Sequence, residues 1–216
     1  MSISAGMVKE LRQKTGAGMM DCKRALDEAN GDVDAAIIVL QKKQLTSVGK
    51  KQGRVAAEGY VGSYIHGEGR IGVLIEVNCE TDFVARGDDF KAFVRDIAMH
   101  VAAVNPTVVN AEDLDQADID QQKEIFLAQA MSEGKPENIA EKMVTGRLKK
   151  WKREVVLMDQ LFVKDTDKSI LDVQNDITVK LGEKISIRRF VRFVVGEGME
   201  KREDDFAAEV AAQANA

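Results

Sequence analysis

The side chains that most often carry catalysis or bind metal ions are few in this sequence and are not grouped. Two cysteines, Cys22 and Cys79, and two histidines, His66 and His100, occur in 216 residues. Metal sites use pairs of such ligands at short spacings, as in CxxC or HxxxH, and neither spacing is present. We therefore expect the four side chains to serve ordinary packing, and we expect neither a metal site nor a cofactor.

Two further patterns match chemical motifs only in part. Residues 67–72 read GEGRIG, the letters of a dinucleotide-binding loop, but a strand pattern follows where that loop needs a helix. Part of a calcium-loop template occurs at 113–124, although Asp118 stands where the template requires glycine. Because no nucleophile–base grouping appears either, we expect no catalytic residues and no enzyme activity.

Two places carry apolar side chains in polar surroundings. Phe83 lies in the turn 81–84, after a well-patterned strand. Such a phenylalanine commonly folds back onto its own core, and the functional alternative is a protruding aromatic wedge beside the carboxylate of Asp82. Met19 and Met20 follow a Gly-Ala-Gly bend. We expect one methionine to pack inward and the other to be exposed, since methionine suits adaptable contact surfaces.

The composition predicts a folded protein of a reducing compartment. Hydrophobic residues make up 44% and charged residues 31% of the chain, so burial can offset the entropy lost on folding. Two cysteines cannot form a disulfide framework, no signal-peptide pattern is present, and no apolar run approaches the ~20 residues of a membrane span. We expect a cytoplasmic protein with no membrane contact.

Charge is unevenly distributed along the chain. It has 31 basic and 36 acidic residues, a net charge of −5, which argues against nucleic acid as the main partner. Residues 42–54 nevertheless hold five basic side chains and no acidic one. A solvated linker is the simpler interpretation. The alternative is a ribosome- or RNA-associated adaptor that uses this segment with Arg188, Arg189 and Arg192.

Hydrophobic periodicity predicts the elements that position these residues, beginning with a helical module over 1–41. Three short helices are expected there, with Ser4, Asp21 and Asp32 as their N-caps. None is long enough to persist alone, so the three must pack on one another. Residues 42–57 are interpreted as a basic linker.

Residues 58–196 are expected to form an α+β core around a small antiparallel sheet. Alternating apolar residues predict strands over 59–66, 70–79 and 185–195. In the last strand we expect Ile185, Ile187, Val191, Phe193 and Val195 on one face and Arg188 and Arg192 on the other. The predicted helices are 88–104, 118–133, 136–158 and 169–181.

The middle two helices are expected to form a helical hairpin at about 118–158, and the chain ends in a tail. A coiled-coil-like seam is expected along Val144, Leu148, Trp151, Val155 and Met158, faced by Ile119, Phe126, Ala130 and Met131. The tail, 197–216, is expected to contain a short amphipathic helix over 203–214.

Two long segments resemble the bacterial elongation factor Ts family. Residues 7–26, MVKELRQKTGAGMMDCKRAL, resemble the family's N-terminal domain, and residues 76–85, EVNCETDFVA, resemble its core signature. Shorter matches lie at 97–103, 133–136, 139–143, 187–190 and 205–210, so the resemblance spans nearly the whole chain.

The resemblance implies guanine-nucleotide exchange on elongation factor Tu, which the chain would bind in GDP-bound and nucleotide-free forms. It implies that the three-helix module has a ubiquitin-associated-like fold and docks on the GTPase domain. The implied docking residues are Lys9, Met19 and Met20. The residues implied to dislodge the partner's magnesium ion are Thr81, Asp82, Phe83 and Val84, with Phe83 as the wedge.

Longer members of that family carry two related core subdomains, whereas this chain combines elements of both in one. The resemblance therefore implies a homodimer in which a second copy supplies the missing half. The seam at 144–158 is expected either to form that dimer or to be satisfied within its own hairpin.

Overall fold

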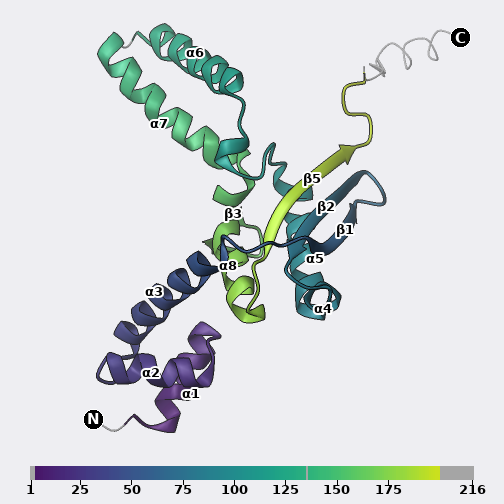
Figure 1. The fold of residues 1–216 in the computed structure, drawn as a ribbon. Coiled ribbons are helices and arrows are strands. Elements are labelled where there is room, and N and C mark those ends of the chain that lie inside the picture. The colour runs from purple at the N-terminus through teal and green to yellow at the C-terminus, as the bar shows by residue number, and fades with distance from the viewer. Residues whose placement is uncertain (1–2, 135, 200–216) are drawn as a thin grey trace, which may run out of the picture.

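The computed structural model describes residues 3–134 and 136–199. It confirms the α+β class: an N-terminal group of helices, a three-stranded sheet with a helix against it, and a helical hairpin that projects away from the sheet (Figure 1). The helix expected over 203–214 lies outside the described residues.

The N-terminal module consists of α1 (Ala5–Thr15), α2 (Met19–Glu28) and the first half of α3 (Val33–Lys51). Ser4 and Asp32 cap α1 and α3 as predicted, accepting hydrogen bonds from the backbone N–H of Met7 and Ala35. The prediction that Asp21 caps α2 is wrong, because the N-cap is Gly18, three residues earlier, and Asp21 lies in the first turn of the helix. The buried side chains of the module are Val8, Leu11, Cys22, Ala25, Leu26, Ala36 and Leu40.

Helix α3 continues through most of the segment that we predicted to be a linker. Residues 42–51 are helical, which limits the connector to 52–57. These ten residues contain no proline, and four of them are lysine, which favours helix. Contacts also hold the helix, since Lys43 pairs with Glu28 at 2.5 Å and Gln44 donates to Asp176 at 2.6 Å.

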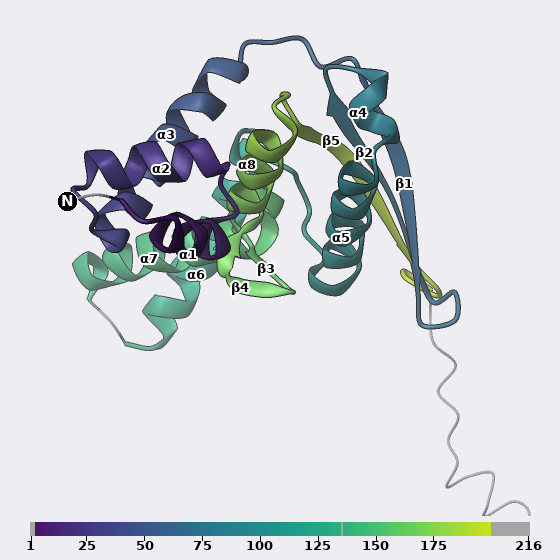
Figure 2. The ribbon, with the colours of Figure 1, turned by 90° about the horizontal axis from the view of Figure 1, so that it is seen from below.

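The sheet has the antiparallel order β1 (Glu58–His66), β2 (Ile71–Cys79) and β5 (Ser186–Val194). One face packs against α5 (Asp88–Val104), which has the predicted bounds. Strand β1 approaches α5 so closely that a Cβ at Gly62 would lie 2.5 Å from Val94 Cγ1. Figure 2 shows α5 on one side of the three strands, with the short helix α4 (Asp82–Arg86) at the end of β2.

Strand β5 contains a bulge that changes which of its side chains face the core. Its register with β2 shifts between Glu76 and Val77, which leaves Arg188 as an extra residue. Ile187 is buried, whereas Val191 and Phe193, beyond the bulge, are exposed on the opposite face. Our expectation that these residues share one face is wrong, because one inserted residue reverses the alternation of side chains.

The predicted helical hairpin is formed by α6 (Gln116–Ser132) and α7 (Glu137–Val155), preceded by the short 3-10 helix η1 (Ala111–Asp113). Val144 and Ala130 are buried in it, Leu148, Trp151 and Val155 are partly buried, and Met131 is exposed instead of facing the seam. Helix α7 ends before the predicted 158, because the Val155 carbonyl accepts from the N–H groups of Thr107 and Val108.

After the hairpin the chain adds a small unit that was not predicted. It contains η2 (Leu157–Asp159) and the two-stranded ribbon of β3 (Leu161–Phe162) and β4 (Asp165–Ser169). The sequence of β4, DTDKS, lacks the alternating apolar residues that predict strands. Helix α8 (Ile170–Leu181) follows, close to its predicted bounds.

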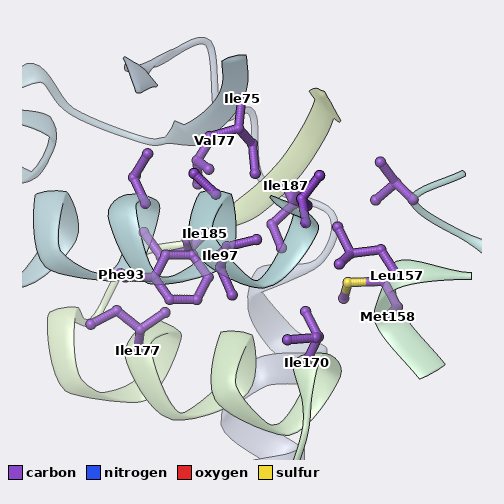
Figure 3. Close-up of a cluster of buried hydrophobic side chains, with 14 of the residues drawn as sticks. Ile75, Val77, Phe93, Ile97, Leu157, Met158, Ile170, Ile177, Ile185 and Ile187 are labelled. Atoms are coloured by element: carbon purple, nitrogen blue, oxygen red, sulfur yellow. The ribbon is translucent and has the colours of Figure 1, made fainter. Parts of the chain in front are cut away.

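The main core lies where the sheet, α5, α8 and the segment 156–158 meet (Figure 3). Each fully buried aliphatic side chain there contributes about 1.5–3 kcal/mol relative to exposure. The residues that converge in Figure 3 are Ile75, Val77, Phe93, Ile97, Leu157, Met158, Ile170, Ile177, Ile185 and Ile187.

The cysteines and histidines lie in four separate places. Cys22 is buried in the module, Cys79 is buried at the end of β2, and His66 is exposed on β1. His100 is fully buried in α5, where its Nε2 lies 2.9 Å from Gln160 Oε1 and burial lowers its pKa below 6.5. Within 3–134 and 136–199 no helix is long and apolar enough to cross a membrane.

Candidate functional site

Phe83 projects from the molecule and is 84% exposed. It lies on α4, a helix of five residues between the end of β2 and the start of α5. Val84 packs partly against the main core, and Ala85 is buried. These two neighbours face inward, so Phe83 is turned toward solvent. Of the two interpretations that the sequence allowed, the structure has the protruding side chain.

The other residues of the 81–84 segment shape the start of α4. Thr81 is the N-cap, and its hydroxyl accepts from Val84 N–H at 3.4 Å. Asp82 lies in the first turn, where a carboxylate interacts favourably with the helix dipole. It also pairs with Arg86 one turn later, at 2.8 Å, and both side chains are exposed. Beside Phe83, α4 thus presents a carboxylate and a guanidinium to any binding partner.

The contacts that anchor this segment come from a part of the chain that we did not single out. Glu183, in the loop between α8 and β5, accepts hydrogen bonds from the N–H groups of Glu80 and Thr81. The partners are more than a hundred residues apart in sequence. No local pattern marks Glu183, since a single carboxylate after a helix-ending glycine is ordinary loop composition.

The second group of candidate residues lies on the N-terminal module. Met19 and Met20 are both exposed, at 58% and 64%, so the expectation that one packs inward is wrong. The reason is that α2 begins at Met19, and its buried face begins only at Cys22, past the two methionines. Lys9 is exposed on α1.

The structure does not bring the two groups together. Met19 and Met20 lie on α2, Phe83 lies on α4, and these helices occupy different ends of the molecule in both views (Figures 1 and 2). A partner that contacts both must therefore be large, as a folded protein is and a small molecule is not.

A third apolar surface covers the face of the sheet opposite α5. Residues that alternate with the buried positions of β1, β2 and β5 point there, and five of them are large, apolar and between 42% and 64% exposed. We call this the outer sheet face. Its apolar residues are Val61, Ile65, Leu74, Val191 and Phe193.

Most of the basic residues of the RNA-adaptor alternative are engaged in contacts within the chain. Arg188 and Arg189 both pair with Glu76, at 2.7 and 2.6 Å, and these hydrogen bonds lower the pKa of the Glu76 carboxyl below its usual value. Arg192 points toward α5 and donates to the Ala102 carbonyl. In 42–54, Lys43 pairs with Glu28 and Arg54 with Glu80. Four of the eight basic side chains are thus paired with carboxylates, whereas Lys42, Lys50 and Lys51 have no such partner among the described residues.

Comparison with known proteins gives a consistent result along the chain. A family model described as "Elongation factor TS" matches residues 45–197. The Elongation factor Ts of Desulforamulus reducens is 59% identical over 214 residues, 99% of each chain. That of Carboxydothermus hydrogenoformans is 59% identical over 97% of each chain, and that of Geobacter sulfurreducens is 56% identical over 99% of each.

Proposed function

Because this chain belongs to the elongation factor Ts family, and is therefore a translation elongation factor, we propose that it binds elongation factor Tu and promotes release of GDP. The observation that carries the proposal is the exposure of Phe83 on an anchored helix. A large aromatic side chain held in solvent contributes little to its own fold, and buried aromatic anchors commonly dominate protein–protein binding.

The proposed mechanism makes and breaks no covalent bond. A GTPase holds GDP through a phosphate-binding loop and a magnesium ion. Insertion of Phe83 between elements of the partner would displace the groups that hold the ion, while Asp82 makes polar contacts and Thr81 and Val84 fix the helix. The same free energy that weakens GDP binding strengthens binding of this chain to the nucleotide-free partner, because the coupling is reciprocal.

The required magnitude limits what Phe83 does alone. A buried aromatic anchor supplies about 2–4 kcal/mol of interface energy, and each ~1.4 kcal/mol changes an affinity tenfold. Fast exchange needs several such factors of ten. We therefore assign the rest of the binding energy to a second contact, through Lys9, Met19 and Met20 on the N-terminal module, which we take to be ubiquitin-associated-like. The two contacts are linked in one chain, so the second forms at high effective concentration.

Release of fluorescently labelled GDP from elongation factor Tu tests the proposal. The full chain should accelerate release in a concentration-dependent and saturable way, and excess unlabelled GTP should complete the exchange. Release at the spontaneous rate at every concentration of the chain would refute the proposed function. We place this activity in the cytoplasm, where translation takes place.

We propose further that the chain forms a homodimer through the outer sheet face. The face exposes five large apolar side chains, and a patch that contacts its own copy across a two-fold axis is self-complementary. The 144–158 seam is a weaker candidate, because Val144 and Met158 are already buried within the chain. Light scattering at micromolar concentration should give twice the chain mass, and Phe193→Asp should give a monomer. A wild-type monomer would exclude the dimer.

The RNA-adaptor alternative predicts binding that falls steeply with salt concentration. The internal pairing of Arg188, Arg189 and Lys43 argues against it. A gel-shift experiment at moderate salt should show no complex with RNA, and a salt-sensitive complex would favour the adaptor instead.

A further inference from the structure

Three segments meet at the base of α4, each from a different part of the chain. They are the connector that follows α3, the junction 80–81 between β2 and α4, and the loop 182–185 between α8 and β5. In Figure 2 the connector crosses from α3 to the side of the sheet that carries α4. Four charged residues link the segments: Arg54, Glu80, Glu183 and Lys184.

Both oxygens of the Glu183 carboxylate bind the 80–81 junction. Oε2 accepts from the backbone N–H of Glu80 at 3.1 Å and from that of Thr81 at 3.0 Å. Oε1 accepts from the Thr81 hydroxyl at 2.7 Å. Hydrogen bonds to an ionised acceptor are stronger than neutral ones, and three of them converge on two adjacent residues.

The hydroxyl of Thr81 connects Glu183 to α4, because it bonds to both. Because it donates its hydrogen to Glu183, its lone pairs are directed elsewhere, and one of them accepts from Val84 N–H at 3.4 Å. A helix of five residues has no stability of its own. Its direction, and with it the direction of Phe83, depends on this cap and on the packing of Val84 and Ala85.

Glu80 and Lys184 link the same two segments a second time, but here the 80–81 junction supplies the acceptor and the 182–185 loop supplies the donor. Glu80 Oε1 accepts from the backbone N–H of Lys184 at 2.6 Å, a bond that lowers the pKa of the Glu80 carboxyl. The ammonium group of Lys184 then donates to the carbonyls of Gln52 and Arg54, at 2.7 and 3.0 Å. The loop that fixes α4 therefore also fixes the end of the connector from the N-terminal module.

We propose that Glu183 is a positioning residue for partner binding: it holds the 80–81 junction so that α4 presents Phe83 in the orientation that the partner accepts. This role rests on the proposed function. Glu183 acts through Thr81 and Phe83, because its carboxylate binds the 80–81 junction and not the partner. Without its carboxylate, α4 samples several directions, and binding must select one of them at a cost in affinity.

The first experiment needs no partner. Amide hydrogen exchange of the full chain, read by NMR, should show the N–H groups of Glu80 and Thr81 exchanging about tenfold faster or more in Glu183→Ala, because both lose a charged acceptor. Glu183→Gln, which keeps one acceptor oxygen and the side-chain length, should give an intermediate value. Glu124→Ala, at an exposed carboxylate on α6, serves as the matched control and should leave both amides unchanged. Unchanged exchange in Glu183→Ala would overturn the proposal.

The second experiment separates positioning from a merely structural role. In the labelled-GDP assay, Glu183→Ala should raise the concentration for half-maximal release about three- to thirtyfold, with Glu183→Gln in between. In a Phe83→Ala background, Glu183→Ala should hardly change the concentration for half-maximal release, because the side chain that Glu183 positions is already absent. An equal effect in both backgrounds would show a general structural role and refute the proposal.

The outcomes also distinguish this proposal from the function on which it rests. If wild type does not accelerate GDP release, the exchange function fails, and the positioning role fails with it whatever the amide exchange shows. If wild type is active and Glu183→Ala equals it in release, only the positioning role of Glu183 is overturned.

Discussion

Replacing Phe83 by alanine should separate the stability of this chain from its binding to elongation factor Tu. Phe83 is 84% exposed, so only about a sixth of a side chain with on the order of 200 Å² of surface is covered. At ~25 cal/mol per Å², that covered area of about 30 Å² contributes about 0.8 kcal/mol at most to the free energy of unfolding. The variant should fold and unfold almost as wild type does.

The same change should have a much larger effect on exchange. Loss of a buried aromatic anchor costs about 2–4 kcal/mol of binding, which corresponds to about 30-fold to about 900-fold in affinity. The assay is release of labelled GDP from elongation factor Tu, measured over a range of concentrations of the chain. Urea unfolding of the same preparations supplies the stability. Ile139→Ala, an exposed apolar residue on α7, is the matched control for loss of surface hydrophobicity.

Two results would contradict this reasoning. Undiminished release by a folded Phe83→Ala variant would mean that the side chain is not the wedge. A loss of stability of several kcal/mol would mean that Phe83 packs within its own chain or against a second copy and is not free to bind the partner.

Three further predictions test other parts of the structure. Met19→Ala with Met20→Ala should raise the concentration for half-maximal GDP release about tenfold without changing the urea midpoint, because both side chains are exposed. Gly62→Ala should lower the free energy of unfolding by about 1–3 kcal/mol, measured with urea, because the new Cβ would lie 2.5 Å from Val94 Cγ1. Burial lowers the pKa of His100 below 6.5, so the unfolded chain binds the proton more readily. The contribution of His100 to the free energy of unfolding should therefore be full above pH 6.5 and fall as the pH drops toward the lower folded pKa. In urea titrations at several pH values, His100→Gln should reduce this dependence of the free energy of unfolding on pH.

Elements with a strong local pattern could be predicted from the sequence. Helix α5 has the predicted bounds because its apolar stripe recurs at helical spacing and Asn105 ends it in a left-handed conformation. The N-caps Ser4 and Asp32 were predicted for the same reason, since a cap and the helix it begins are neighbours in sequence.

The structure differs from the sequence-based predictions where contacts between residues distant in sequence determine the conformation. The bulge at Arg188 depends on pairing with β2. Arg189 interrupts the apolar alternation of the β5 sequence, but this interruption does not show that Arg188 is an inserted residue. Residues 42–51 have the composition of a linker or a helix, and contacts with Glu28 and Asp176 favour the helix.

The residues of the candidate site could likewise be predicted only in part from the sequence. The residues at 81–84 and at 19–20 could be named from motif and composition. The outward direction of Phe83 could not, because it follows from the inward packing of Val84 and Ala85 against the main core. Glu183 could not be named either, because its role exists only once the chain has folded and joined its loop to β2.

The length of α3 sets the distance and the rotation between the N-terminal module and the connector. Its 19 residues span about 28 Å, and its two ends belong to different bodies, the helical module and the connector that Lys184 holds. Inserting one residue in 42–51 would move the module by about 1.5 Å and turn it by about 100°. Such a turn would carry Met19 and Met20 to another side of the molecule with every contact inside the module intact. Insertions or deletions in 42–51 that add or remove close to a whole number of helical turns should therefore best preserve the direction in which the module faces.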